Sequence, residues 1–145
     1  MVDVTTDILI ERPPGVVSAF ACDPANAPLW YGNIKRVEWQ SEPVVVVGAR
    51  VAFVAEFLGK RLQYTYEVVE FEPGERLVMR AADGPFPMET IYTFEETREG
   101  QTQMTLRNHG EPSGMSRLMT PMIATAMRSA NTKDLAKLKE ILEGH

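Results

Sequence analysis

The sequence predicts an α+β domain in which six or seven antiparallel strands curve around one long C-terminal helix. Two observations lead to this fold class. Apolar and polar side chains alternate with a period of two through most of residues 2–110, which is typical of strands that bury one face. From Pro112 onward the apolar side chains follow helical spacing instead. No repeat or linker-like stretch divides the chain, so residues 1–145 are expected to form a single domain.

The composition is globular and acidic, and it argues against several classes of function. The net charge is −5, which leaves no basic excess for binding nucleic acid. The apolar runs are too short to cross a membrane, and the first residues show no export signal. The single cysteine, Cys22, cannot form an internal disulfide and suits a small buried position. These features predict a cytoplasmic protein without stable membrane insertion. Nothing in the sequence signals an oligomeric state, and residues 143–145 resemble the remnant of an affinity tag.

The first forty residues are predicted to form a strand, two short helices and a second strand. Residues 2–11 alternate apolar and polar side chains. Pro13-Pro14 ends this strand and suits the first turn of a short helix, where N–H groups have no partner within the helix. Asp23-Pro24 has the pattern of an N-cap and a first-turn proline for a second short helix that ends near Trp30. A strand is expected around residues 34–41, with its apolar side chains on one face.

Four hairpin loops are predicted to set the register of the strands in residues 48–110. Gly59-Lys60 is interpreted as a two-residue turn, and 72–75 as a type II turn with proline followed by glycine. Residues 83–86 and 96–100 form the other loops. Each loop places the apolar side chains on one face of the sheet. The residues expected to face each other across neighbouring strands are Phe53 and Tyr66, Val68 and Met79, Met79 and Thr90, and Thr90 and Leu106.

This register predicts a charged outer face and an inner face with no Asp, Glu, Lys or Arg from the strands. The outer row runs Glu67, Arg80, Glu89 and Arg107, and facing opposite charges stabilise a solvated sheet by about 0.2–1 kcal/mol per pair. His109 falls opposite Pro87 on the outer face, so a structural or solvent-facing role is expected for it rather than catalysis. Neither a metal nor a nucleotide cofactor is predicted, because the sequence has no spaced His/Cys cluster and no glycine-rich phosphate loop.

The C-terminal part of the chain carries an apolar stripe at helical spacing. Its members are Met115, Leu118, Met119, Met122, Ile123, Ala126, Ala130, Leu135, Leu138, Ile141 and Leu142. Pro121 lies early in this run and predicts a kink or a break between a short first segment and the main helix. The first half of the stripe is rich in alanine, which leaves space, and in methionine, which fills irregular space.

Large residues on the predicted sheet and small or flexible ones on the helix indicate an imperfectly filled interior. A plain methionine-rich core is the alternative, and the residues alone leave it open. The few inward polar groups, with Asn131 on the helix among them, suit orienting a ligand better than acid–base chemistry. The residues predicted to line the cavity and contact a ligand are Trp30, Trp39, Phe53, Phe57, Tyr64, Tyr66, Met79, Met88, Thr90, Tyr92, Met104, Asn108, Met119, Met122, Ile123 and Ala126.

Five segments together cover most of the chain and carry a family resemblance. They are PPGVVSAF at 13–20, ACDPANAPLW at 21–30, VGARV at 47–51, YEVVEFEP at 66–73 and DLAKLKEILE at 134–143. On these segments the chain resembles the START-like helix-grip (SRPBCC) superfamily, and within it the polyketide cyclase/dehydrase subgroup. The resemblance implies a seven-stranded antiparallel sheet, two short helices after the first strand, and a hydrophobic tunnel beneath the long helix. It also implies that Trp30 and Tyr31 lie near the mouth of that tunnel.

Two functions are expected from these observations. The first is binding of a small hydrophobic metabolite (a lipid, a quinone, an aromatic or a polyketide-like compound) between the sheet and the C-terminal helix. The alternative is a polyketide cyclase or dehydratase, a lyase-type enzyme acting on a carbonyl compound without a metal or nucleotide cofactor. In that case Tyr64, Tyr66, Tyr92 and Asn108 would orient and polarise the substrate. A protein-interaction role ranks last, because it needs an apolar patch where the predicted register places charges.

Overall fold

Seven strands form a single antiparallel sheet in the computed structural model, which describes residues 1–57, 59–81, 87–112 and 118–144. The strands are β1 (Val2–Ile10), β2 (Ile34–Trp39), β3 (Arg50–Phe57), β4 (Lys60–Glu72), β5 (Arg76–Ala81), β6 (Met88–Arg98) and β7 (Gln101–Gly110). Their order in the sheet is β1-β7-β6-β5-β4-β3-β2. The predicted α+β class and the seven-stranded antiparallel sheet are therefore confirmed.

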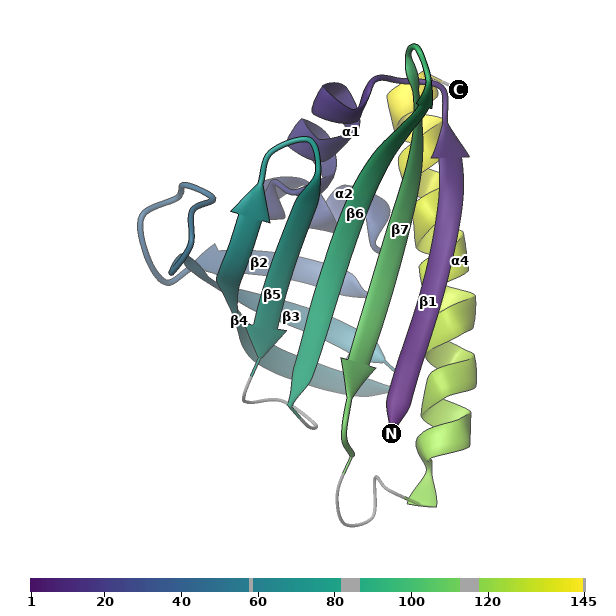
Figure 1. Cartoon of the computed structure of the whole chain (residues 1–145). Helices are drawn as coiled ribbons and strands as arrows, with labels where there is room; N and C mark the ends of the chain where they lie inside the picture. The colour runs from purple at the N-terminus through teal and green to yellow at the C-terminus, as the bar shows by residue number, and fades with distance from the viewer. Residues whose placement is uncertain (58, 82–86, 113–117, 145) are drawn as a thin grey trace.

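The helices lie on one side of the curved sheet, with the longest one beside β1 (Figure 1). They are α1 (Pro14–Ala21), the 3-10 turn η1 (Pro24–Asn26), α2 (Ala27–Trp30) and α4 (Thr120–Glu143). The Asp23 carboxylate accepts a hydrogen bond of 3.0 Å from the Ala25 N–H, which confirms the predicted cap. Within the described part of the chain, no helix is both long and apolar enough to cross a membrane.

Pro121 does not kink the long helix, because it lies in the first turn of α4. The N–H groups of a first turn have no intrahelical partner, so proline is tolerated there. Of the two expected outcomes, a kink is not observed, whereas the turn at Met119 separates helical Leu118 from α4 and agrees with a break. The segment expected before it, with Met115, falls outside the described residues. At the other end of α4, Glu143 accepts a hydrogen bond of 2.8 Å from the Glu11 N–H, so this residue packs as part of the domain.

The central hairpins have the predicted register. Val68 faces Met79 across β4 and β5, and Met79 faces Thr90 across β5 and β6. The turn after β4 is the expected type II turn: Gly74 has a φ of +80°, and the Glu75 N–H donates to the Glu72 carbonyl at 2.9 Å. The loop at 83–86 lies outside the described residues.

The hairpin between β3 and β4 has the predicted faces and a different register. Phe53 faces Tyr64 rather than Tyr66. The loop closes between Phe57 and Lys60, so Gly59, with a φ of +77°, is the second loop residue and not the first. The register is therefore shifted by two residues. Because side chains alternate with a period of two, this shift leaves every side chain on its predicted face.

The hairpin between β6 and β7 shows the same kind of shift. Thr90 faces Asn108 rather than Leu106. The ladder continues past a bulge to the Arg98–Gln101 pair, so the loop is shorter than the five residues predicted, and Gly100 supplies its positive φ of +76°. Again the faces are preserved.

The shifted register changes which charges meet on the outer face. His109 lies opposite Glu89 and not Pro87, with its Nε2 at 3.0 Å from the Glu89 Oε1. Arg80 also contacts Glu89, at 2.7 Å, and its hydrogen bonds hold the pKa of that carboxyl below the usual value. Arg107 instead pairs with Asp3 of β1, at 2.8 Å. His109 therefore belongs to the outer charge row and takes no part in the interior.

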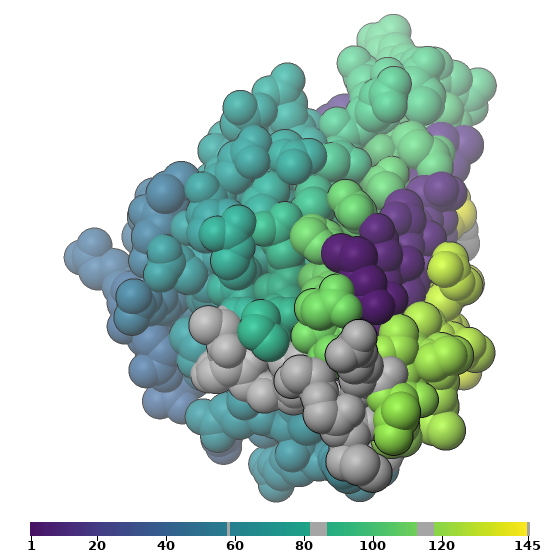
Figure 2. All heavy atoms as spheres, turned by 60° about the horizontal axis from the view of Figure 1, so that its bottom comes forward, coloured from purple at the N-terminus to yellow at the C-terminus, as the bar shows by residue number. Residues whose placement is uncertain are grey.

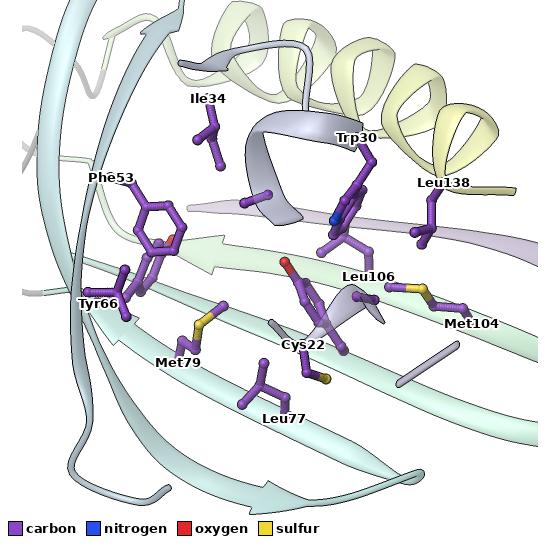
Figure 3. Close-up of a cluster of buried hydrophobic side chains, with 14 of the residues drawn as sticks. Cys22, Trp30, Ile34, Phe53, Tyr66, Leu77, Met79, Met104, Leu106 and Leu138 are labelled. Carbon is purple, nitrogen blue, oxygen red and sulfur yellow. The ribbon is translucent and has the colours of Figure 1, made fainter. Parts of the chain in front are cut away.

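The concave face and α4 enclose the hydrophobic core, and the core is tightly filled at one end. Figure 3 shows Trp30, Leu138, Met104 and Leu106 together between the helix and the sheet. Each of these four side chains is at most 1% exposed. Cys22 packs into the same cluster as predicted, and burial raises the pKa of its thiol to about 11, which keeps it neutral.

Removing Leu138 is expected to destabilise the fold through this filled end. Because the side chain is fully buried, Leu138→Ala should lower the free energy of unfolding by about 2–5 kcal/mol in urea denaturation. The matched control is Leu118→Ala, at a position that is 77% exposed, where a change below about 0.5 kcal/mol is expected. Equal losses in the two variants would contradict the assignment of the core.

Candidate functional site

A cavity of about 270 Å³ lies between the concave face of the sheet and α4. This volume lies just below the range of about 300–1,000 Å³ that is usual for small-molecule sites. Apolar and aromatic side chains make up most of its wall. The lining residues are Tyr31, Asn33, Ile34, Phe53, Ala55, Phe57, Lys60, Leu62, Tyr64, Tyr66, Met79, Ala81, Met88, Thr90, Tyr92, Asn108, Met119, Ile123, Met127, Ala130, Asn131 and Asp134.

The cavity exists because the interior is filled unevenly along α4. At one end Trp30 and Leu138 occupy the space between helix and sheet. Toward the start of the helix, alanines line both walls: Ala55 and Ala81 on the sheet and Ala130 on α4. An alanine leaves the volume of a larger side chain empty, and folded interiors otherwise pack closely. The hollow therefore follows from where the small residues lie.

One end of the cavity lies near the β3–β4 hairpin and the start of α4. Two of its lining residues are exposed there, Lys60 next to the hairpin loop and Met119, which is 42% exposed. Figure 2 turns this end of the molecule forward, with the first residues of β1 beside the end of β7 and the start of α4. Because Lys60 is the first residue of β4 and lines the cavity, the expectation that no charged strand residue faces inward is wrong.

Most of the residues predicted from the sequence line the cavity, and five do not. Those in the wall are Phe53, Phe57, Tyr64, Tyr66, Met79, Met88, Thr90, Tyr92, Asn108, Met119 and Ile123. Trp30 and Met104 lie in the filled end of the core instead, and Trp39 packs near the end of the edge strand β2. Met122 is 55% exposed, and Ala126 lies outside the wall. Trp30 is therefore a core residue and not a mouth residue, whereas Tyr31 lines the cavity.

The errors on the helix have a common cause, which is the rotation of α4 about its axis. The cavity-facing positions are Ile123, Met127, Ala130, Asn131 and Asp134. They are spaced along the helix as expected for one face. In the second half of the set, however, two of the cavity-facing residues are polar, Asn131 and Asp134. A search for apolar residues alone shifts the predicted face toward Met122 and Ala126. Spacing back from buried Leu138 by four residues would have found Asp134.

On the sheet side of the cavity, three side chains form a hydrogen-bonded chain. The Thr90 hydroxyl donates to the Asn108 Oδ1 at 2.7 Å, and the Tyr66 hydroxyl lies 2.7 Å from the Thr90 oxygen. Because Thr90 has only one hydroxyl hydrogen, Tyr66 is the donor in the second bond. Burial raises the pKa of Tyr66 to about 12, so its hydroxyl stays neutral.

A pair of phenols, Tyr92 on the sheet and Tyr31 in the α2–β2 connection, forms a second hydrogen-bonded group. The hydroxyls of Tyr31 and Tyr92 lie 2.5 Å apart. Burial raises the pKa of both phenols well above the ordinary value, so both remain protonated at neutral pH. One of the two hydrogens makes the bond between them, which leaves the other available to a further acceptor.

Asp134 is a carboxylate in the cavity wall that the sequence analysis did not single out. It is 5% exposed, and its Oδ1 accepts a hydrogen bond of 2.9 Å from the Gly32 N–H. Burial raises its pKa to about 6, and the hydrogen bond from Gly32 opposes that shift only in part. On its other side lies a surface groove lined by three lysines, Lys35, Lys133 and Lys137. Asp134 thus stands between the apolar interior and a basic surface.

A buried polar donor on α4 completes the wall. Asn131 is 5% exposed, and its Nδ2 has no hydrogen-bond partner among the described residues. Most buried polar groups in proteins are paired, so an unpaired one in a cavity wall calls for an explanation. The indole Nε1 of Trp30 is also unpaired within the described part of the chain, but Trp30 does not line this cavity.

A curved antiparallel sheet closed by a C-terminal helix over an apolar cavity defines a START-like helix-grip protein. The chain belongs to the family described as polyketide cyclase / dehydrase and lipid transport, whose family model matches residues 1–143. A search of curated proteins found no match to the sequence.

Solved structures share the fold at low sequence identity. A START superfamily protein from Mycobacterium smegmatis superposes with a TM-score of 0.83 at 12% identity, covering 98% of this chain and 97% of that one. The protein TTHA0849 from Thermus thermophilus gives 0.83 at 19% identity, with 98% and 97% covered. The Zhui aromatase/cyclase from Streptomyces sp. R1128 gives 0.82 at 15% identity, with 97% and 93% covered. At these identities the similarity shows the fold alone.

The buried carboxyl of Asp134 predicts a pH-dependent effect of the substitution Asp134→Asn. Its pKa lies near 6 in the folded chain and at the ordinary value of 3.8 once unfolded, so folding favours the protonated form. As the pH rises from about 4 through about 6, the buried carboxyl of the wild-type protein ionises and lowers the free energy of unfolding. The neutral amide avoids that loss and can still accept from Gly32. The difference in free energy of unfolding, variant minus wild type, should therefore become about 1–3 kcal/mol more positive between pH 4 and pH 7.5.

Urea denaturation of both proteins at the two pH values measures this difference. Asp7→Asn, at an exposed position of β1, is the matched control and should show no such change. If Asp134→Asn were destabilised equally at both pH values, the carboxyl would not be buried in the unfavourable setting described.

Proposed function

We propose that this protein binds a small hydrophobic metabolite (a lipid, a quinone, an aromatic or a polyketide-like compound) between the sheet and α4. The observation that carries the proposal is the cavity of about 270 Å³, with apolar walls and a few hydrogen-bonding groups. Membership of a family described by polyketide cyclisation, dehydration and lipid transport agrees with it. The cytoplasm is the proposed location, because the only cysteine, Cys22, is a buried neutral thiol rather than half of a disulfide.

The walls favour flat or ring-shaped ligands. Phe53, Tyr64 and Tyr66 form an aromatic cluster whose ring centroids lie 5.4–6.0 Å apart. Such rings offer large, rigid apolar surfaces to a planar ligand. Met79 and Met127 add unbranched side chains that adapt to its outline. Burial of each ligand CH₂ group against these walls contributes about 0.8 kcal/mol to binding.

A second candidate function is cyclisation or dehydration of a carbonyl compound. It is favoured by one observation: a buried carboxyl, Asp134, shares the cavity with protonated phenols. A carboxylate with a pKa near 6 can take a proton from an enolisable carbon at neutral pH, and a neutral phenol can donate to the carbonyl oxygen. Chromatography with mass spectrometry of poly-β-carbonyl compounds after incubation tests it, since cyclisation alone gives an isomer of the same mass and a different retention time, and dehydration removes one water. Unchanged masses and retention times across such compounds would refute this second function.

Filling the cavity is expected to weaken ligand binding. Ala130→Phe places a ring in the cavity wall and should weaken binding of 2-methoxynaphthalene, a neutral aromatic probe, by at least about tenfold. Ala136→Phe introduces the same ring on an exposed position of the same helix and should leave binding unchanged. Isothermal titration calorimetry measures both affinities, and the thermal midpoint verifies folding.

The wild-type protein supplies the complementary measurement. Extraction of the purified protein followed by mass spectrometry should recover a hydrophobic compound. Neutral aromatic probes should also raise its thermal midpoint. If no compound is recovered and no probe shifts the midpoint, the proposed binding function is wrong.

A further inference from the structure

Two polar side chains of α4 face the cavity with unused hydrogen-bonding capacity. The Nδ2 of Asn131 has no partner among the described residues, although the side chain is 95% buried. Leaving such a buried donor unpaired destabilises the folded protein. Asn131 lies in the wall of the cavity, so a bound ligand can reach it.

Asp134 lies beside Asn131 on the same face of the helix. Residues three positions apart on a helix have their Cβ atoms about 5–6 Å from each other. The Oδ1 of Asp134 accepts the Gly32 N–H, and its Oδ2 has no hydrogen bond from the part of the chain that the structure describes. A donor and an acceptor therefore stand side by side in the cavity wall.

Two hydroxyls on the sheet side, those of Tyr66 and Thr90, differ because their hydrogens are already used within the protein. Tyr66 donates to Thr90 and Thr90 donates to Asn108, so neither hydroxyl has a hydrogen left for a ligand. Tyr31 and Tyr92 share one bond, which uses one of their two hydrogens. Among the fully buried polar side-chain atoms of the cavity wall in the described residues, the Asn131 Nδ2 is the one left without a partner.

We propose that Asn131 and Asp134 together recognise a neutral hydroxyl group on an otherwise apolar ligand. The hydroxyl oxygen would accept from the Asn131 Nδ2, and its hydrogen would be donated to the Asp134 Oδ2. This inference rests on the proposed binding function and names the chemistry of its ligand.

A hydroxyl satisfies both groups because it is a donor and an acceptor at the same atom. An ether or a ketone can accept from Asn131 but leaves the Asp134 oxygen without a donor. A carboxylate has no hydrogen to donate, and its charge is repelled by the ionised Asp134 in a low-dielectric setting. The subsite therefore selects alcohols and phenols over ethers and over acids of the same shape.

Matched probes test this selectivity. The wild-type protein is titrated at pH 7.5 with 2-naphthol and 2-methoxynaphthalene, which differ by one methyl group on the oxygen. Wild type should prefer the naphthol by about tenfold, the effect of one hydrogen bond to a charged group. Asp134→Leu removes the acceptor and should reduce that preference to about twofold or less while retaining affinity for 2-methoxynaphthalene. Asn131→Leu removes the donor that both oxygens use, and should weaken both probes by a similar factor of about threefold to tenfold. Titration with 2-naphthylmethanol distinguishes an alcoholic from a phenolic ligand.

A charged probe tests the contribution of Asp134 separately. At pH 7.5 the wild-type protein should bind 2-naphthoate more weakly than 2-methoxynaphthalene. Asp134→Asn removes the negative charge and should strengthen 2-naphthoate binding by about tenfold, with little change for 2-methoxynaphthalene. A purely structural role for Asp134 would move both affinities together.

The outcomes separate this inference from the function on which it rests. Equal affinities for the naphthol and its ether, or unchanged affinities for both in a folded Asn131→Leu variant, would overturn the hydroxyl subsite and leave ligand binding standing. If Asn131→Leu fails to fold, Asn131→Ala and the 2-naphthoate titration of Asp134→Asn decide the question. Failure of every probe to bind would overturn both the inference and the proposed function.

Discussion

The covering of the concave sheet face by α4 is the interaction on which the rest of the structure depends. That face carries aromatic, methionine and aliphatic side chains from nearly every strand, and without the helix it would be exposed to water. Ile123, Met127, Leu135 and Leu138 bring the buried stripe of α4 against it. Hydrophobic burial of this kind is the main favourable contribution to folding. The position of every cavity residue follows from this contact.

A straight helix against a curved sheet cannot fill the space between them evenly. Near Leu138 the indole of Trp30 occupies the gap, and the packing is tight. Toward the start of α4 no comparable side chain intervenes, and alanines line both walls. The same element that completes the core at one end therefore creates the cavity at the other. The filled end and the hollow end are therefore different halves of one interface.

The polar groups of the interior are arranged in two layers with different roles. On the sheet, the Tyr66 hydroxyl donates to Thr90 and the Thr90 hydroxyl donates to the Asn108 Oδ1. On the helix, Asn131 and Asp134 retain unused capacity. Burial keeps the phenols neutral and raises the pKa of Asp134. An apolar ligand can thus be oriented by a few groups at one side of the cavity.

The sequence by itself determined the fold class and the face on which each strand residue lies. Period-two alternation is a local property, so Phe53 and Tyr66 could be assigned to the concave side even with their pairing wrong by two residues. Register depends on where a loop closes, and one glycine, such as Gly59, fits either loop position. Only the tertiary structure decided that Trp30 fills the core and that Asp134 faces the cavity. The environment of a helical side chain depends on how the helix is rotated against its neighbour, which its own spacing does not specify.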